Sequence, residues 1–369
     1  MAAERAFEAQ PATTWWSAAP SAKLSDRPKR GTMQDRLVFL IGAPRSGSTL
    51  TARMLGAHSE IFAPVEPHLM PPLAHLGFHD KVDAAPYDPV ITQLGLREFV
   101  GLLPGGEDDY LDALRGATDQ LYERALAPSG RSRFLDKTPA YALVLDFLAK
   151  LYPQAKYVVL TRHPIAVWSS VVDSFFDGDH EAALAHNPIL ERYVPAIARF
   201  LRERQVDLHH LRYEQLVQDP EAEMEAVCRF LDLPFEPGMV DYGEHESAKA
   251  PAARGLGDPV TVAQETRPTT ASLDKWAKAL AGDGARLAQC REIVAQLTDP
   301  DLEAWGFSGP ELRKALAELQ PTGSGPSRGR LTRHALERRV LVAVRRNIHH
   351  NALGRLVRFV RAGCDVLLR

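Results

Sequence analysis

An unbroken apolar run followed by a short turn rich in glycine and serine constrains the fold of this chain more than any other feature. Residues 37–41 are all apolar, and the turn Gly42–Thr49 follows directly. An apolar run of this length that ends at glycine is typical of a strand buried on both faces of a parallel sheet. Apolar residues then recur at helical spacing at Leu50, Met54 and Leu55. The stretch therefore predicts a strand, a tight turn and a helix.

The turn itself predicts an anion-binding site, because successive backbone N–H groups at a helix N-terminus form a concavity for a tetrahedral anion. Its spacing fits the phosphate loop of nucleoside triphosphatases, except that Ser48 stands where those loops carry lysine. Such enzymes also need an acidic residue on a second strand for Mg²⁺, and the candidate strand at 157–161 offers none. The only cation in the loop is Arg45. We expect a metal-free anion held by arginine and hydroxyl groups.

At these residues and at a second turn, the chain resembles the sulfotransferases that use 3′-phosphoadenosine 5′-phosphosulfate (PAPS). The segment Pro44–Thr49 is similar to their 5′-phosphosulfate loop, and Arg162, followed eight positions later by Ser170, is similar to their 3′-phosphate site. The resemblance covers about residues 36–310 and implies an α/β fold with a phosphate-loop-like parallel sheet flanked by helices. It also implies PAPS as co-substrate, without a metal, bound by the following residues: Arg45, Ser46, Gly47, Ser48, Thr49, Arg162 and Ser170.

The resemblance also implies catalytic roles. A short strand predicted at 61–63 delivers Glu66 and His68 at its carboxyl end, where ligands of open α/β sheets bind. Tyrosylprotein, carbohydrate and polyketide sulfotransferases place their general base in this segment, which implies that role for Glu66, with His68 assisting it or lining the acceptor pocket. Lys137, at the end of the next predicted strand, can stabilise charge on the departing oxygen, and Arg45 on the sulfate completes the catalytic set.

Three later residues are implied as nucleotide contacts by the same resemblance. Tyr213 lies in a run similar to the structural signature of the family, residues 211–221. Arg254 lies where relatives bring a late loop over the nucleotide. Lys275 belongs to a segment that is similar to their Ser-x-x-x-Trp element.

Local patterns predict further elements around these motifs. Helical stretches are expected near 94–103 and 110–126, in an insertion that covers the acceptor. Helix starts are expected at Thr138-Pro139, at Pro164 and at Asp219-Pro220, because proline is favoured in the first turn and Thr or Asp before it caps the helix.

The implied reaction is in-line attack of an acceptor hydroxyl on sulfur, with Glu66 as general base. Two alternatives stay open. A phosphate-loop kinase acting on a small molecule would have to work without the loop lysine and a magnesium-binding aspartate. A nucleotide-binding module that has lost catalysis is less consistent with the presence of Glu66 and Lys137.

Composition divides the chain into three parts. Residues 1–34 have no periodicity and are expected to form a mobile leader. Residues 35–320 are expected to form the sulfotransferase domain. A linker rich in Gly, Pro and Ser follows, and residues 328–369 carry eleven arginines against two acidic residues beside apolar positions at helical spacing. This predicts a basic amphipathic helix, which either contacts an anionic membrane surface or docks on the domain.

Partners and location follow from the same features. The acceptor is expected to be a hydroxylated small molecule, acyl chain, glycan or lipid, with a tyrosyl peptide also open, and no nucleic acid is expected to bind. Three cysteines without metal or redox spacing and the lack of an apolar signal core predict a cytoplasmic protein, peripheral at the membrane if the tail helix binds there.

Overall fold

The computed structural model of the protein describes residues 32–76, 78–79, 89–176, 178–186, 188–244 and 265–320. The expected leader, the basic tail and Arg254 lie outside these residues. Five parallel strands form one sheet in the order β2-β3-β1-β4-β5. The strands are β1 (Leu37–Gly42), β2 (Ile61–Phe62), β3 (Arg133–Asp136), β4 (Lys156–Thr161) and β5 (Leu208–Arg212). The parallel α/β sheet predicted from the sequence is thus confirmed.

The central strand β1 is buried on both faces, as its apolar run predicts. Val38 and Leu40 pack into one hydrophobic core, whereas Leu37, Phe39 and Ile41 pack into the other. The two sets alternate because successive side chains of a strand point to opposite faces of a sheet. Burial on both sides fixes β1 in the middle of the sheet and holds the loop that follows it.

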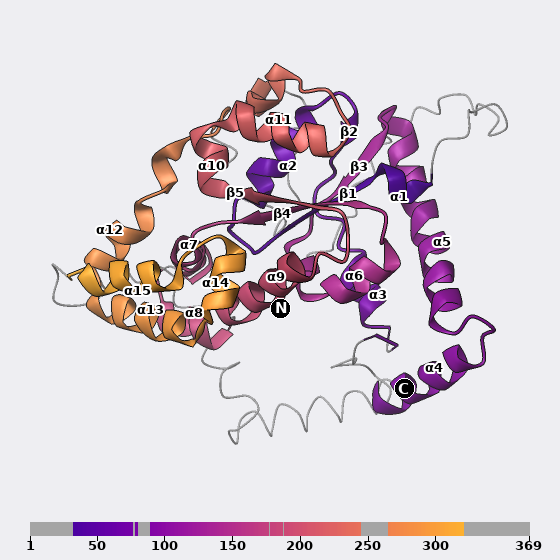
Figure 1. Cartoon of the computed structure of the whole chain (residues 1–369), viewed down its shortest axis with the longest axis horizontal. Helices are drawn as coiled ribbons and strands as arrows, with labels where there is room; N and C mark the ends of the chain where they lie inside the picture. The colour runs from indigo at the N-terminus through magenta and orange to yellow at the C-terminus, as the bar shows by residue number, and fades with distance from the viewer. Residues whose placement is uncertain are drawn as a thin grey trace, which may run out of the picture. The chain divides into compact units, whose positions relative to one another are not determined.

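Helices cover both faces of the sheet (Figure 1). Apolar side chains of α2, α10 and α11 belong to the core on one face, and those of α5, α6, α7 and α9 to the core on the other. The helices with these roles are α2 (Ser48–Ala57), α5 (Glu107–Leu126), α6 (Leu145–Leu151), α7 (Pro164–Phe176), α9 (Ile189–Glu203), α10 (Tyr213–Gln218) and α11 (Pro220–Phe230). The remaining α-helices are α1 (Met33–Arg36), α3 (Met70–Ala74), α4 (Pro89–Gly101), α8 (His180–His186), α12 (Lys275–Ala281), α13 (Gly284–Gln296), α14 (Asp299–Trp305) and α15 (Gly309–Glu318).

Most predicted helix starts are confirmed. Helix α7 begins at Pro164, and α11 begins at Pro220 with Asp219 as its cap, accepting the N–H of Ala222 at 3.1 Å. Helices α4 and α5 occupy the predicted insertion between β2 and β3. Among the described residues, no helix combines the length and the apolar character needed to cross a membrane.

The segment after β3 differs from the expected helix. Thr138 makes no cap, and Pro139–Leu143 forms a 3-10 helix, η3, before α6. The Thr138 hydroxyl instead accepts the backbone N–H of His68 at 3.2 Å. A partner seventy residues away in the sequence has replaced the local one.

Candidate functional site

The loop between β1 and α2 is held in a compact conformation. Arg45 and Gly47 both have positive φ, 66° and 100°, and the Ser46 N–H donates to the carbonyl oxygen of Ala43 at 3.1 Å. A Cβ atom at Gly47 would overlap the ring of Tyr213. Glycine is therefore required there by both its backbone angle and the close approach of the ring.

Ser46 differs from the other predicted loop residues. It is fully buried, and its hydroxyl lies next to Gly42, where an added Cβ would stand 2.7 Å from it. Within the described part of the chain this hydroxyl has no hydrogen-bond partner. It lies away from the cavity that the loop borders, so Ser46 can contribute to that cavity through its backbone.

A cavity of about 520 Å³ opens where the loop, the end of β2 and the start of α7 meet. It brings together ten of the thirteen residues predicted from the sequence. Ser46 and Lys137 do not line it, and Arg254 is outside the described residues. The predicted residues on its wall are Arg45, Gly47, Ser48, Thr49, Glu66, His68, Arg162, Ser170, Tyr213 and Lys275.

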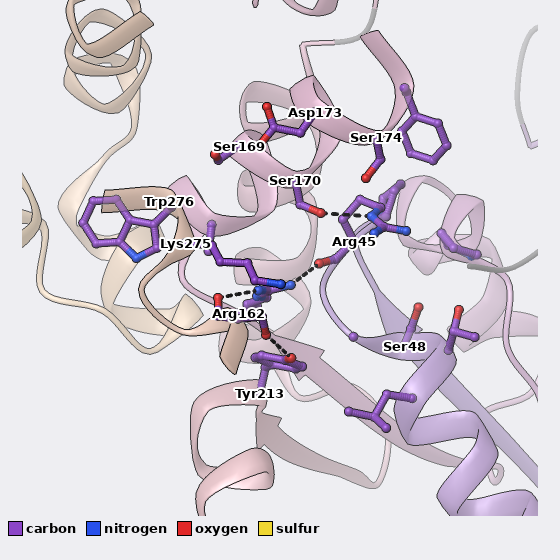
Figure 2. Close-up of a pocket in the computed structure, with 18 of the residues that line it drawn as sticks. Arg45, Ser48, Arg162, Ser169, Ser170, Asp173, Ser174, Tyr213, Lys275 and Trp276 are labelled. Carbon is purple, nitrogen blue, oxygen red and sulfur yellow. Dashed lines mark hydrogen bonds between the residues drawn. The ribbon is translucent and has the colours of Figure 1, made fainter. Parts of the chain in front are cut away.

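The two predicted anion-binding turns contact each other directly (Figure 2). The Arg45 Nε donates to the Ser170 hydroxyl at 3.0 Å, and the Arg162 guanidinium donates to the carbonyl oxygen of Arg45 at 3.0 Å. Both contacts follow from the sheet, because β1 and β4 are neighbours and their carboxyl ends share one edge. One site, rather than two, is the result.

Arg162 is held from several sides. The residue is 9% exposed, and its guanidinium lies 4.2 Å from the centre of the Tyr213 ring and donates to the carbonyl oxygen of Ser272 at 3.2 Å. Burial lowers the pKa of Arg162 from its ordinary value, but arginine stays charged in proteins. The Trp305 indole N–H donates to the Arg162 carbonyl oxygen at 2.8 Å. The cation is therefore fixed before any ligand binds.

The segment from Ser272 to Trp276 forms another wall of the cavity. Ser272 shares a hydrogen bond of 2.7 Å with the Tyr213 hydroxyl, and Trp276 stacks on His163 with ring centres 4.4 Å apart. Burial, and then the charge of Arg162, lowers the pKa of His163 to about 4. His163 is thus a neutral packing partner near neutral pH.

Glu66 and Lys137 form an ion pair at the other side of the cavity. Both side chains are nearly buried, 10% and 5% exposed, and His68 adds its Nε2 at 3.3 Å from the second Glu66 oxygen. Glu66 and His68 line the cavity, while Lys137 is in contact with Glu66. A carboxylate that lines the cavity can accept a proton and become neutral, and the ammonium group paired with it then keeps an unbalanced positive charge.

Sequence reasoning missed a polar cluster beneath this pair. Asp136 is fully buried, and one of its oxygens accepts the hydroxyl groups of Tyr122 at 2.7 Å and Tyr141 at 3.0 Å. Burial raises the pKa of Asp136 to about 7, although both tyrosines and Lys137 oppose the shift. The position of Asp136 at a strand end beside Lys137 was the available signal.

Several cavity residues on α7 and α9 also carried no motif. They include Ser169, Asp173, Ser174 and Phe175, which flank Ser170 on α7, and Tyr193 on α9. The spacing of three and four residues from Ser170 to Asp173 and Ser174 was the signal for a shared helix face. Among the described residues, no group of three or more His, Cys, Asp or Glu side chains is placed to hold a metal ion.

Comparisons with known proteins agree with this geometry. A family model described as "Sulfotransferase family" matches residues 38–237, more than half of the chain. The nodulation protein NoeE of Sinorhizobium fredii is 31% identical over 60% of this chain and 55% of its own length. The protein-tyrosine sulfotransferase of Drosophila melanogaster is 24% identical over 56% of this chain and 40% of its own. The chain therefore spans about half the length of these curated relatives, or less.

Among solved structures, the sulfotransferase domain of the Synechococcus PCC 7002 olefin synthase matches 76% of this chain and 94% of its own, with 24% identity and a TM-score of 0.45. The family match covers the loop after β1 and the cavity residues up to Tyr213, whereas the wall from Ser272 to Trp276 lies beyond it. The chain belongs to the sulfotransferase family.

Proposed function

We propose that the protein transfers the sulfuryl group of PAPS to a hydroxyl group of an acceptor. The observation that carries the proposal is that the loop after β1 and Glu66 line the same cavity. Arg45 and the loop N–H groups suit the phosphosulfate, and Glu66, which is paired with Lys137, lines the same cavity. Family membership supports the same chemistry.

The donor is proposed to contact both turns. The loop N–H groups, Arg45 and the hydroxyls of Ser48 and Thr49 would hold the 5′-phosphosulfate. Arg162 and Ser170 would hold the 3′-phosphate, which ATP lacks. The direct contact between Arg45 and Ser170 supports this arrangement, since one ligand can then touch both turns.

In the transfer step, the acceptor oxygen attacks sulfur and forms a new S–O bond. The bond from sulfur to the bridging phosphate oxygen breaks, and adenosine 3′,5′-bisphosphate leaves with the electron pair. Glu66 takes the acceptor proton, which is worth roughly 10²–10⁴-fold in rate. As Glu66 becomes neutral, the positive charge of Lys137 is no longer balanced by a carboxylate. This charge would then offset the negative charge that develops on the leaving oxygen. The ion pair between the two residues supports this exchange of charge.

The acceptor is proposed to carry its hydroxyl on an apolar group. The lining of the cavity includes the apolar and aromatic residues Pro139, Ala140, Tyr193 and Phe175. Phe175 is 45% exposed, and covering such a ring with an apolar ligand is favourable. An acyl chain, a lipid or an aromatic molecule fits this wall better than a glycan.

The test combines donor binding with sulfate transfer. Calorimetry is expected to show adenosine 3′,5′-bisphosphate binding that is independent of Mg²⁺. Radiolabelled PAPS is then supplied with naphthol, octanol, tyrosine amide or N-acetylglucosamine. Glu66→Gln is expected to lower kcat by roughly 10²–10⁴-fold and to leave donor binding unchanged. Binding of Mg-ATP alone would contradict the proposal and favour a kinase. Donor binding without any transfer would favour a non-catalytic module.

A further inference from the structure

The hydroxyl of Tyr141 links the buried carboxyl group of Asp136 to the backbone just after the proposed base. It accepts the N–H groups of Leu69 at 2.9 Å and Met70 at 3.4 Å, and it donates to Asp136 Oδ2 at 3.0 Å. A hydroxyl group has one donor and two acceptor sites. The two amides and Asp136, together with the Thr138 side chain, which also hydrogen-bonds to this hydroxyl, therefore hold it in one orientation.

The backbone held in this way adopts an unfavourable conformation. His68 has a φ of 54°, which is rare for a residue other than glycine and persists only when the surroundings enforce it. The Thr138 hydroxyl accepts the His68 N–H, and Tyr141 takes the next two amides. Three consecutive N–H groups are thus bound by side chains from one short stretch of chain.

The same stretch carries Lys137, the ion-pair partner of Glu66. The turn from β3 into η3 therefore contacts the base segment twice, through the ion pair at Glu66 and through hydrogen bonds at residues 68–70. Loss of the hydrogen bonds at residues 68–70 would leave the ion pair as the remaining one of these two links. A shift of about 1 Å in a reacting group can cost about 10²-fold in rate.

We propose that Tyr141, fixed by Asp136, is a positioning residue that sets the geometry of Glu66 against Lys137. The proposal rests on the proposed function only for its effect on turnover. Neither Tyr141 nor Asp136 lines the cavity, so each acts through the base segment rather than on a ligand.

Tyr122 provides a matched control. Its hydroxyl donates to the same Asp136 oxygen at 2.7 Å from helix α5, and it is buried like Tyr141. This hydrogen bond goes to Asp136 and not to the base segment. Tyr122→Phe and Tyr141→Phe both remove one donor from one carboxyl group, and only Tyr141→Phe also removes the acceptor for Leu69 and Met70.

The kinetic test measures sulfate transfer from radiolabelled PAPS to the best acceptor of the panel. Tyr141→Phe is expected to lower kcat by about tenfold or more and to leave the KM for PAPS unchanged, because the two anion-binding turns are not touched. Tyr122→Phe is expected to keep kcat within about twofold. Equal losses in the two variants, or no loss in either, would overturn the positioning role.

A second measurement is independent of turnover. Amide hydrogen exchange at Leu69 and Met70 is expected to be faster in Tyr141→Phe than in the wild type and unchanged in Tyr122→Phe. Equal exchange in the two variants would overturn the proposal, whatever the activity, whereas a wild-type protein that transfers no sulfate would overturn the proposed function. If Tyr141→Phe does not fold, Thr138→Val removes the acceptor of the His68 N–H with little change in shape and tests the same segment.

Discussion

Two carboxyl groups near the end of the sheet show how surroundings decide what a residue does. Glu66 faces the cavity and is paired with an ammonium group, whereas Asp136 is fully buried against two hydroxyl groups. Burial disfavours the charged form of Asp136 and raises its pKa to about 7. Glu66 is therefore accessible from the cavity, as the proposed base must be, whereas Asp136 is not.

The raised pKa of Asp136 predicts a pH dependence of stability. Its ordinary pKa is 3.8, so between about pH 4 and pH 7 the folded state holds a proton that the unfolded state has lost. Protonated Asp136 stabilises the folded state relative to the unfolded state. This stabilisation is fully present below about pH 4 and is lost as the pH rises through 7. The Tm of Asp136→Asn is expected to decrease less between pH 5 and pH 8 than the Tm of the wild type. Identical profiles for the wild type and Asp136→Asn would contradict the assignment.

Phe175 tests the acceptor class at the level of one side chain. Phe175→Ala is expected to raise the KM for an apolar acceptor by roughly tenfold, because apolar contact area is lost. The KM for PAPS is expected to change much less, although the ring lies 5.9 Å from the Arg45 guanidinium. Phe99→Ala is the control, since Phe99 is also exposed and does not line the cavity. An equal effect of the two variants on acceptor KM would argue against an apolar acceptor wall.

At the level of elements, local sequence patterns predicted the strands and helix starts that depend on residues close in the sequence. The buried strand β1, the loop after it and the helix starts at Pro164 and Pro220 are all present. The expected helix cap at Thr138 was wrong because its hydroxyl has a distant partner, His68. A hydrogen bond between side chains or backbone groups far apart in the sequence produces no local pattern. The roles of such side chains could therefore not be predicted.

Gly47 tests the loop as an element. Gly47→Ala is expected to lower both stability and the affinity for adenosine 3′,5′-bisphosphate, the latter by about tenfold or more. The residue has a φ of 100°, and a Cβ would overlap the Tyr213 ring. Gly116→Ala, inside helix α5 with no atom near its Cβ position, is expected to stabilise by up to ~1 kcal/mol. A Gly47→Ala protein with wild-type affinity would refute the account of the loop.

At the scale of the whole sheet, the site depends on which strands are neighbours. The two turns that are proposed to bind anions follow β1 and β4, which pair in parallel over five positions from Val38 to Gly42. The motifs predicted that both turns serve one ligand, and the strand order places them together. Contacts such as Trp305 to the Arg162 carbonyl oxygen, 143 positions away, required the folded structure, because neither residue type signals its partner.

The most direct test of the central claim, that two turns hold two ends of one nucleotide, is calorimetry with adenosine 3′,5′-bisphosphate and with AMP. The wild type is expected to prefer the bisphosphate by roughly 10–100-fold, because charge-assisted hydrogen bonds to the 3′-phosphate contribute about 1.5–3 kcal/mol. Ser170→Ala is expected to narrow this preference severalfold, and Ser132→Ala, before β3, to leave it unchanged. Equal affinity of the wild type for the two nucleotides would contradict the claim.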